Sequence, residues 1–457
     1  MSKAESDKLS TKSYAAKVLH KSLVTGVSNI IESSSIICKI FKTTVLLLCM
    51  VGFVYQVYYF VKDVLTFPSV VNVRVETLKE FVAPAYTFCN TNGIKRSKYC
   101  EKYPEFCEKP ENMTDFCLQY SYYCRVNTEN FTMPIEDAYY TEVNGTEDVF
   151  KELGQDLESF LANLRDHMRE DIEGPFERYM EHADKILQCY SKNSLVDSNK
   201  LPKLTSKTLG GIPIDSFEFD LEEHETFNRN GMPGALFALH SPFVAVDPDL
   251  DGILLKPGRS YKIHLSIEEQ VSLPWPYKTD CVNYTLIWEN ENRTGPRSKT
   301  ACEEECILTH FLTCMNCSMP WWLYPHNATI CDTDNLENYS CPDMSERYDK
   351  YYDCLDECKV DCSKVKYQYE VKERYIASSA FKGSRRKNHR FTYVDIFLTE
   401  REIVTLEHRP QYKDVEVYSY IGGFMGCWLG VSLVAVIDFI ESIVHILFYH
   451  MKKRYYS

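Results

Sequence analysis

Hydrophobic residues are concentrated in two long runs, one toward each end of the chain. The first run, residues 43–61, is uncharged and lies between Lys42 and Lys62. A helix rises about 1.5 Å per residue, so this run is long enough to cross about 30 Å of hydrocarbon. A cleaved signal peptide is a weaker explanation, because a long polar segment precedes the run and no small-residue cleavage site follows it. The pattern predicts a transmembrane helix at residues 43–62.

The second run is uncharged over residues 417–437. It then continues past Asp438 and Glu441 until basic residues begin at Lys452. A buried core helix is the alternative for both runs, but neither has the polar stripe of a helix on the surface of a globular core. The pattern predicts a second transmembrane helix at residues 417–450.

Basic residues beside the two runs predict their orientation. Seven lysines and three acidic residues precede the first run, and three basic residues with no acid follow the second. By the positive-inside rule, both termini are expected in the cytosol. The expected parts outside the spans are a cytosolic N-terminal segment, an extracellular domain and a cytosolic tail, at residues 1–42, 63–416 and 451–457.

Composition agrees with a large folded domain between two spans. The chain has 457 residues, a formal net charge of −14, a hydrophobic fraction of 44% and a mean hydropathy of −0.32. These values exclude a disordered chain and a polytopic helix bundle. The segment between the spans contains essentially all of the acidic excess.

Cysteines support an oxidising location for residues 63–416. Sixteen of the 19 cysteines lie there, an even number suited to disulfide bonds. A zinc site is the alternative for the cluster around His310, but secreted thiols are normally oxidised, and no metal or cofactor is expected. Asn-x-Ser/Thr glycosylation sites in the same segment begin at Asn112, Asn130, Asn144, Asn283, Asn292, Asn316, Asn327 and Asn338.

Local patterns between the spans predict a mixture of helices and strands. Alternating or extended apolar segments predict strands at residues 70–75, 81–89, 234–240, 261–267, 367–377, 391–398 and 402–408. Apolar residues at helical spacing predict an amphipathic helix over residues 154–188, and helices at 302–317 and 346–362. Cysteines in the last two helices are four residues apart, so disulfides could join these helices in antiparallel order, rung by rung.

Several motifs resemble those of the degenerin/epithelial sodium channel superfamily, which includes the acid-sensing channels. They are Ala83-Pro-Ala-Tyr-Thr-Phe-Cys-Asn90, Leu273-Pro-Trp-Pro-Tyr277, a ten-cysteine pattern that begins at Cys281, and Gly422-Gly-Phe-Met-Gly-Cys-Trp-Leu-Gly-Val-Ser432. The resemblance covers nearly the whole chain. It implies an α+β membrane protein that forms trimers. Each subunit would have two transmembrane helices and a disulfide-rich extracellular domain with a β-sheet palm and a helical thumb and finger.

The resemblance also implies a set of nested disulfides. They are Cys281 with Cys362, Cys302 with Cys358, Cys306 with Cys354, Cys314 with Cys341, and Cys317 with Cys331. One family cysteine in the finger is replaced here by His224. The partner of Cys89 is therefore left open among Cys100, Cys107, Cys117, Cys124 and Cys189.

Small residues in the second span are candidates for an ion-selective filter. Backbone carbonyls or hydroxyls of Gly430, Val431 and Ser432, repeated around an axis, can replace the water shell of an ion. The alternative is a packing face, because Gly422, Gly426 and Gly430 are spaced as Gly-x-x-x-Gly. The resemblance favours a Gly-x-Ser filter for sodium.

Acidic residues follow the filter candidate within the same hydrophobic run. Asp438 and Glu441 would lie one helical turn apart, and a charge inside a bilayer costs about 2.5–3.5 kcal/mol unless it meets water or a partner. Their presence predicts an aqueous, cation-attracting path. Interfacial acids at a slanted helix end are the alternative.

Four further residues have gating roles that the resemblance implies. Ser419 matches a small residue whose enlargement holds family channels open, although a helix-capping role is the alternative. Gly26 belongs to a motif in which Thr25 replaces the family histidine. Tyr59 and Tyr277 match a pair that joins the thumb base to the first span, although an interfacial tyrosine belt is as good an explanation for Tyr59.

The resulting functional expectation is a channel subunit in the plasma membrane. The resemblance implies a sodium-selective, amiloride-sensitive homotrimer or heterotrimer, and nucleic acid is not an expected partner. An ATP-gated purinergic-type channel is one alternative, with the basic run 382–390 as its phosphate site. A non-conducting membrane-anchored receptor is another. An enzyme is not expected, because hydrolase and phosphate-loop motifs are absent from the sequence. The gating stimulus stays open among protons, peptides, force and constitutive opening.

Overall fold

The computed structural model divides the chain into two compact units. Its described residues are 30, 33–77, 80–125, 129–135, 152–164, 169–180, 185–196, 198–206, 212–229, 231, 233–319, 322–324, 326–329, 331, 344–376, 391–399 and 402–455. The first unit comprises Met1–Val70, Trp275–Lys278 and His408–Ser457, and the second comprises Val71–Pro274 and Thr279–Glu407. Both predicted hydrophobic runs fall in the first unit.

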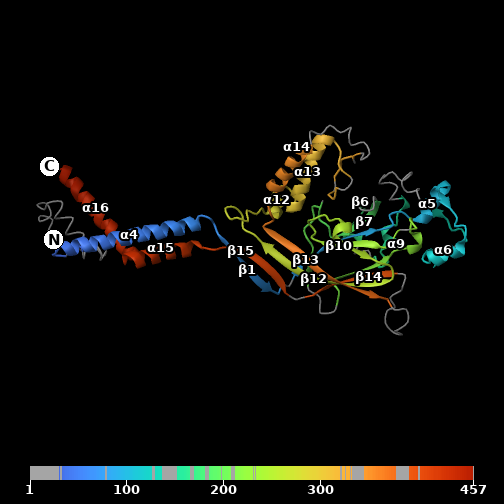
Figure 1. Cartoon of the computed structure of the whole chain (residues 1–457), viewed down its shortest axis with the longest axis horizontal. Helices are drawn as coiled ribbons and strands as arrows, with labels where there is room; N and C mark the ends of the chain where they lie inside the picture. The colour runs from blue at the N-terminus through green and yellow to red at the C-terminus, as the bar shows by residue number, and fades with distance from the viewer. Residues whose placement is uncertain are drawn as a thin grey trace. The chain divides into compact units, whose positions relative to one another are not determined.

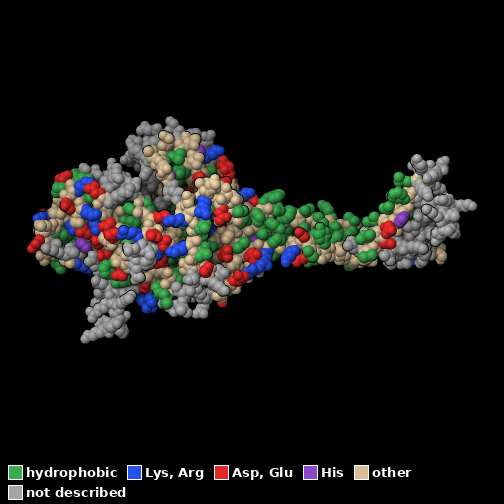
Figure 2. Space-filling view, turned by 180° about the vertical axis from the view of Figure 1, so that it is seen from behind, with side chains coloured by type: hydrophobic (Ala, Val, Ile, Leu, Met, Phe, Trp, Pro, Cys, Tyr) green, Lys and Arg blue, Asp and Glu red, His purple; other side chains and the backbone are tan. Residues whose placement is uncertain are grey.

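Three helices dominate the first unit: α4 (Ile36–Val64), α15 (Asp414–Leu429) and α16 (Leu433–Tyr455). Helix α15 runs antiparallel beside α4, and α16 continues in a different direction (Figure 1). No residue of α4 is buried, and hydrophobic side chains cover the surface of α4 and α15 (Figure 2). Exposed apolar surface of this extent marks a membrane or protein contact.

The second hydrophobic run does not form the single helix that its composition predicts. Among the described residues, α4 is the one helix long and apolar enough to cross a membrane, and α15 has only 16 residues. The transmembrane segment expected over residues 417–450 is divided into two helices, because Gly430 adopts a left-handed conformation that ends α15.

The described strands form two larger sheets. The first has six strands in the order β1 (Ser69–Glu76), β15 (Ile403–Pro410), β12 (Arg259–Val271), β14 (Phe391–Leu398) and β9 (Asp215–Asp220), with β13 (Ser363–Tyr375) also paired to β12. Strand β12 alternates buried and half-buried residues, so its apolar side chains face one side. Along its other edge β12 pairs first with β14 and then with β15, both in parallel.

The second large sheet is antiparallel and has five strands. Its order is β11 (Ile253–Leu255), β10 (Ala235–His240), β3 (Ala85–Asn90), β7 (Lys185–Lys192) and β6 (Ile172–Met180). Every residue of β3 and of β10 is buried, which explains why both segments consist mainly of apolar residues. Two short pairs join β2 (Glu80–Val82) to β8 (Leu204–Ser206), and β4 (Cys107–Glu108) to β5 (Met133–Pro134).

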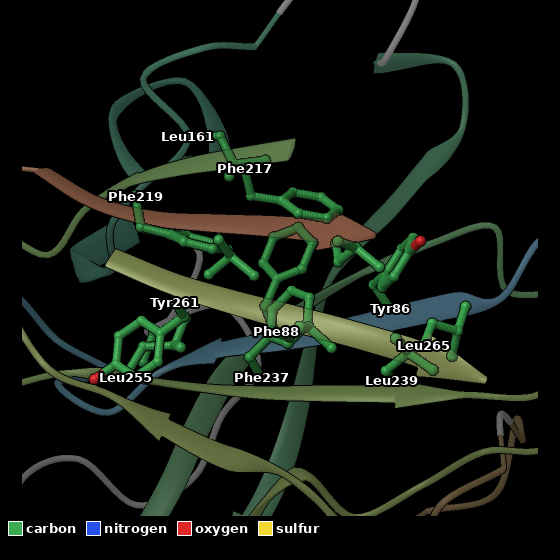
Figure 3. Packing of buried hydrophobic residues seen from close by; sticks show 14 of the residues in the cluster. Tyr86, Phe88, Leu161, Phe217, Phe219, Phe237, Leu239, Leu255, Tyr261 and Leu265 are labelled. Carbon is green, nitrogen blue, oxygen red and sulfur yellow. The ribbon is translucent and has the colours of Figure 1, made fainter. Parts of the chain in front are cut away.

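An aromatic core holds the two large sheets together. Phe88 of β3, Phe237 of β10, and Phe217 and Phe219 of β9 are at most 1% exposed and lie in one cluster (Figure 3). The rings of Phe88 and Phe219 meet edge to face with centroids 5.4 Å apart. Buried aromatic rings contribute large apolar areas, so this cluster fixes the two sheets against each other.

Helices lie in the connections between these strands. They are α5 (Arg96–Lys102), α6 (Met113–Gln119), α9 (Leu157–Phe160), α11 (Pro248–Asp251), α12 (Tyr284–Asn290), α13 (Lys299–Met315) and α14 (Met344–Glu357). Single turns of 3-10 helix are η1 (Pro104–Phe106), η2 (Tyr123–Arg125) and η4 (Glu223–Glu225). Helices α13 and α14 lie where the sequence predicts helices, and the predicted strands correspond to β1, β2, β3, β10, β12, β13, β14 and β15.

The amphipathic helix expected over residues 154–188 is wrong. In the part of this segment that the structure describes, α9 is a helix of only four residues, and β6 and β7 occupy the later part. Phe160 and Leu161 are nevertheless buried in the aromatic core, so their apolar periodicity reflects core contacts rather than a long helix. Pro175 lies inside the segment, and proline cannot continue a helix interior.

Candidate ion pathway

The last hydrophobic run is interrupted at the three residues that the sequence selects as a filter. Helix α15 ends at Leu429, and α16 begins at Leu433. Gly430 has a φ of 61°, and its N–H donates to the Gly426 carbonyl at 3.0 Å. The absence of a Cβ makes this left-handed conformation accessible to glycine without steric cost.

The interruption is capped on its other side by Ser432. The Ala435 N–H donates to the Ser432 Oγ at 3.3 Å, which satisfies an otherwise unpaired amide at the start of α16. Gly430, Val431 and Ser432 thus form a short non-helical link between two helices. Non-helical backbone of this kind has carbonyl oxygens that are available to coordinate an ion or water.

Helix α16 contains the two acidic residues of the hydrophobic run. Asp438 is half-buried, and Glu441 lies one turn later on the same helix. The Glu441 carboxylate is 3.6 Å from His445 Nε2, and both side chains are more than 60% exposed. The sequence analysis missed His445, although its spacing of four residues from Glu441 is a recognisable helical pairing signal.

Close packing joins α15 to α4 at a glycine. A Cβ added to Gly52 would lie 2.7 Å from the Trp428 ring. The indole Nε1 of Trp428 donates to Gln56 Oε1 at 2.6 Å, one turn further along α4. By contrast, nothing among the described residues lies within 4 Å of a Cβ built on Gly422, Gly423 or Gly426.

An aromatic cluster joins the other ends of the same helices. The Phe60 ring of α4 lies 5.3–5.5 Å, centroid to centroid, from the rings of Tyr412, Tyr420 and Phe424. The Tyr412 hydroxyl donates to Asp63 Oδ2 at 2.9 Å. The sequence analysis missed this cluster, because only the fold brings residues so far apart in the chain into contact.

The candidate gating residues occupy different positions. Ser419 lies inside α15, is exposed, and donates its hydroxyl to the Val415 carbonyl at 2.9 Å. The capping alternative for Ser419 is wrong, because the N-cap of α15 is Lys413. Gly26 lies outside the described residues, as does the basic run 382–390.

The two candidate tyrosines make different ring contacts. Tyr277 lies 5.8 Å from Phe67, centroid to centroid. Tyr59 instead contacts Tyr55 and Tyr58, at 4.5 and 5.5 Å. The described ring contacts therefore do not bring Tyr59 and Tyr277 together, and they identify Phe67 as the aromatic partner of Tyr277.

In the second unit, disulfides hold α13 and α14 side by side. Cys302 bonds to Cys358 and Cys306 bonds to Cys354, one helical turn further along. Cys281–Cys362 and Cys317–Cys331 are the other two described bonds of this region. All four pairs are those that the resemblance implies. Cys341, the implied partner of Cys314, lies outside the described residues.

Three more disulfides resolve the pairing that the sequence leaves open. Cys89 bonds to Cys189 across the neighbouring strands β3 and β7. Cys100–Cys107 and Cys117–Cys124 each close a loop with a sequence separation of 7 residues. In the described part of the chain, no group of histidine, cysteine and acidic residues is arranged to hold a metal ion.

Acidic residues with altered proton affinity lie at the start of α13. Burial, and then the neighbouring Glu303, raise the pKa of Glu304. Burial also raises the pKa of Asp361, although its Oδ1 accepts a hydrogen bond from the Lys299 N–H at 3.1 Å. A proton taken up by either carboxyl group would remove negative charge from a partly desolvated position.

Comparisons with known proteins agree with this arrangement. A sequence model of the family described as "Amiloride-sensitive sodium channel" matches residues 18–442. The chain belongs to the amiloride-sensitive sodium channel family. The match includes α4, α15, the interruption at Gly430 and the first part of α16, together with the whole second unit. The superfamily that the sequence motifs indicate is thereby confirmed.

Individual relatives in this family are acid-sensing ion channels. Acid-sensing ion channel 1C of Danio rerio is 23% identical over 421 residues, which cover 86% of this chain and 75% of the relative. Acid-sensing ion channel 1 of Gallus gallus is 23% identical over 301 residues, which cover 62% of this chain and 54% of the relative. Acid-sensing ion channel 1A of Danio rerio is 21% identical over 471 residues, which cover 94% of this chain and 88% of the relative.

The described glycosylation candidates all have exposed side chains. They are Asn112, Asn130, Asn283, Asn292, Asn316 and Asn327, whereas Asn144 and Asn338 lie outside the described residues. Asn112 and Asn283 are also N-caps, of α6 and α12, and accept backbone hydrogen bonds through their side-chain oxygens. A sugar attaches to the side-chain nitrogen, so glycosylation is compatible with both caps.

Proposed function

We propose that this chain is a subunit of a trimeric, sodium-permeable cation channel whose pore follows α15 and α16. One observation is the main support: the last hydrophobic run is interrupted at Gly430, Val431 and Ser432. Lipid does not tolerate unpaired backbone groups, so such a link is stable at membrane depth only where it lines water or protein. Three copies around an axis would place a ring of carbonyls and hydroxyls at one level of the pore.

Acidic residues on α16 supply the charge selectivity in this proposal. Three copies of Asp438 and Glu441 form rings of negative charge after the filter. Such rings attract cations and repel anions, because a low-dielectric wall focuses their field. His445 Nε2 lies 3.6 Å from the Glu441 carboxylate, so it is next to the second ring.

The remaining parts of the proposal extend the family description to this chain. Amiloride block follows from the name of the family. The subunit crosses the plasma membrane twice, by α4 and by the combined length of α15 and α16, with both termini in the cytosol. Family relatives assemble as homotrimers or heterotrimers, and we propose the same for this chain.

Current recording in oocytes tests the pore assignment. The chain is expressed at the surface, and external Na⁺ is replaced by the bulky cation N-methyl-D-glucamine. We expect an inward, amiloride-blocked Na⁺ current, with Ser432→Cys changing the relative permeability to Li⁺, Na⁺ and K⁺. Asp438→Ala should lower single-channel conductance. Asp414→Ala, at the exposed start of α15, is the matched control and should leave both properties unchanged.

The outcomes separate a pore from other roles of this segment. If Ser432→Cys and Asp438→Ala both leave selectivity and conductance at the parent values, the pore does not pass these residues. A chain that reaches the surface and stays silent under acid, peptide and stretch, alone and with related subunits, contradicts the channel assignment.

The gating role proposed for Ser419 has its own test. Its side chain is exposed on α15 in the single chain, so in the proposed trimer a larger residue there would press against a neighbouring subunit. We expect Ser419→Phe to give constitutive current. Val415→Phe, an exposed position one turn earlier, serves as the control. Normal surface expression of Ser419→Phe with a closed pore would count against the role.

A further inference from the structure

A polar cavity in the second unit lies between elements of the two large sheets. Its volume is about 200 Å³, and β3, β7, β8 and β9 or the residues next to them form its walls. Two lysine–aspartate pairs and three neutral polar side chains supply its chemistry, contributed by Lys192, Asp215, Lys203, Asp171, Tyr86, Asn193 and Thr205. The cavity is distant in sequence from the pore candidates and is built from different residues.

One ion pair of the cavity is buried. Lys192 at the end of β7 lies 2.5 Å from the Oδ2 of Asp215, which begins β9, and the side chains are 8% and 17% exposed. The ammonium also lies 5.2 Å from the centroid of the Phe217 ring. This pair links the five-stranded sheet to the six-stranded sheet at the cavity wall.

The second ion pair is more accessible. Lys203, next to β8, lies 2.6 Å from the Oδ2 of Asp171, and the side chains are 56% and 32% exposed. The two pairs together give the wall two positive and two negative charges, so the net charge of the lining is zero. A ligand with one net charge would therefore leave a charge without a counterpart in the cavity.

These groups retain hydrogen-bonding capacity beyond the contacts that they make. A lysine ammonium has three N–H donors and a carboxylate has about four acceptor sites. Asp215 uses Oδ1 for the Ser216 N–H and Oδ2 for Lys192. Burial, and then the charge of Asp215, raise the pKa of Tyr86, so its hydroxyl keeps its proton. That hydroxyl points away from the aromatic core (Figure 3).

We propose that this cavity binds a small zwitterion, a free α-amino acid, with the ligand carboxylate on the lysine ammoniums and the ligand ammonium on the aspartates. Each pair then gains a second partner of opposite charge, and the site stays neutral. A bound zwitterion therefore leaves every charge in the cavity with a partner of opposite sign. A simple anion or a simple cation would leave one charge without such a partner.

The size of the cavity narrows the ligand further. Pockets for drug-sized ligands span roughly 300–1,000 Å³, so this one is too small for such a molecule or for a peptide. At about 30 Å³ for each water in the liquid, it corresponds to about six or seven waters. Amino acids between alanine and leucine in size have about six to nine non-hydrogen atoms, and molecules of this size fit the volume of the cavity.

Thermal stability of the purified full-length protein tests this site. The protein in lipid nanodiscs is titrated with L-alanine or L-leucine in phosphate buffer, because buffers that contain amino acids would compete. L-leucinamide presents only the cation, 4-methylpentanoate only the anion, and Leu-Leu a longer molecule. We expect alanine or leucine to raise the midpoint of unfolding in a saturable way. The other three compounds should bind at least 10-fold more weakly.

Variants at the accessible pair test the charge argument. Lys203→Gln and Asp171→Asn each leave the lining with one net charge while sparing the buried pair. Each should weaken amino-acid binding at least 10-fold without lowering the ligand-free midpoint to the same degree. Lys200→Gln, which removes an exposed lysine three residues before Lys203, is the matched control and should bind as the parent does.

The results that overturn the proposal are equally defined. One is an unchanged midpoint of unfolding with either amino acid up to about 50 mM, which is roughly 50 times a dissociation constant of 1 mM. Equal binding of leucine, leucinamide and 4-methylpentanoate would also overturn it, as would full binding by both cavity variants. None of these results bears on the pore, so the two proposals fail or stand separately.

Discussion

The contact between Gly52 and Trp428 makes α4 and α15 sensitive to a single methyl group. In Gly52→Ala, the new Cβ would lie 2.7, 2.9 and 2.9 Å from three carbons of the Trp428 ring. Favourable carbon–carbon separations are about 3.5–4.0 Å, so the overlap is about 0.8 Å. The indole cannot move freely, because its Nε1 donates to Gln56. Overpacking of this kind costs about 1–3 kcal/mol, and a lost interhelical hydrogen bond adds about 0.6 kcal/mol in a membrane.

Fluorescence-detected size-exclusion chromatography after heating measures this cost in detergent-solubilised protein. We expect Gly52→Ala to lower the midpoint of thermal loss by several degrees. Val54→Ile also adds one methyl group to α4, at a position that is 57% exposed, and should leave the midpoint unchanged. Trp428→Phe shortens the ring, so the double variant should be more stable than the sum of the single effects predicts.

Two results would refute the reasoning about this contact. One is a Gly52→Ala protein with the parent midpoint, which would mean that the helices do not approach closely there. The other is strict additivity of Gly52→Ala and Trp428→Phe, which would mean that the two side chains do not share a contact.

Three further predictions concern the filter, the acids near α13 and the disulfides. Gly430→Val forces a β-branched residue to a φ of 61° and should abolish current at normal expression, as patch recording would show; a normal current would contradict the left-handed link. A raised pKa means that Glu304 binds its proton more tightly in the folded protein than in the unfolded chain. This tighter binding contributes fully to stability below about pH 4, and the contribution is lost as the pH rises through the folded pKa of Glu304. Glu304→Gln should therefore flatten the fall in unfolding midpoint above pH 4, and an unchanged pH profile would contradict the burial argument. Removing the Cys306–Cys354 disulfide by Cys306→Ser and Cys354→Ser should lower the free energy of unfolding by about 2–4 kcal/mol in chemical denaturation. An unchanged free energy of unfolding would show that this disulfide does not constrain the unfolded chain.

The sequence predicts many elements of the second unit because their patterns are local. Strand β12 alternates apolar and polar residues, and α13 presents cysteines at the spacing of one helical turn. The long helix expected over residues 154–188 fails for the opposite reason. Its apolar spacing satisfies a core built by other strands, and Gly174 and Pro175 interrupt it within β6. These two residues were the available signal against a helix.

The candidate pathway is predictable in composition but not in contacts. Asp438 can be identified from the sequence because an acid is costly in lipid, and Gly430 because a glycine can leave the helical conformation without steric cost. The contact of Trp428 with Gly52, and that of Tyr412 with Asp63, join segments more than 300 residues apart. No local pattern encodes such pairs, since they depend on how the whole chain folds.

The short link at Gly430 also separates two kinds of mutational tolerance. Before it, α15 is anchored to α4 through a ring seated on a glycine, so size is the property under constraint on that face. After it, α16 begins with its own cap and contains Asp438 and Glu441, so in the proposed pore charge is the property under constraint. The three-residue link therefore joins two helices with different local support: α15 packs closely on α4, and α16 starts with a hydrogen-bonded turn of its own.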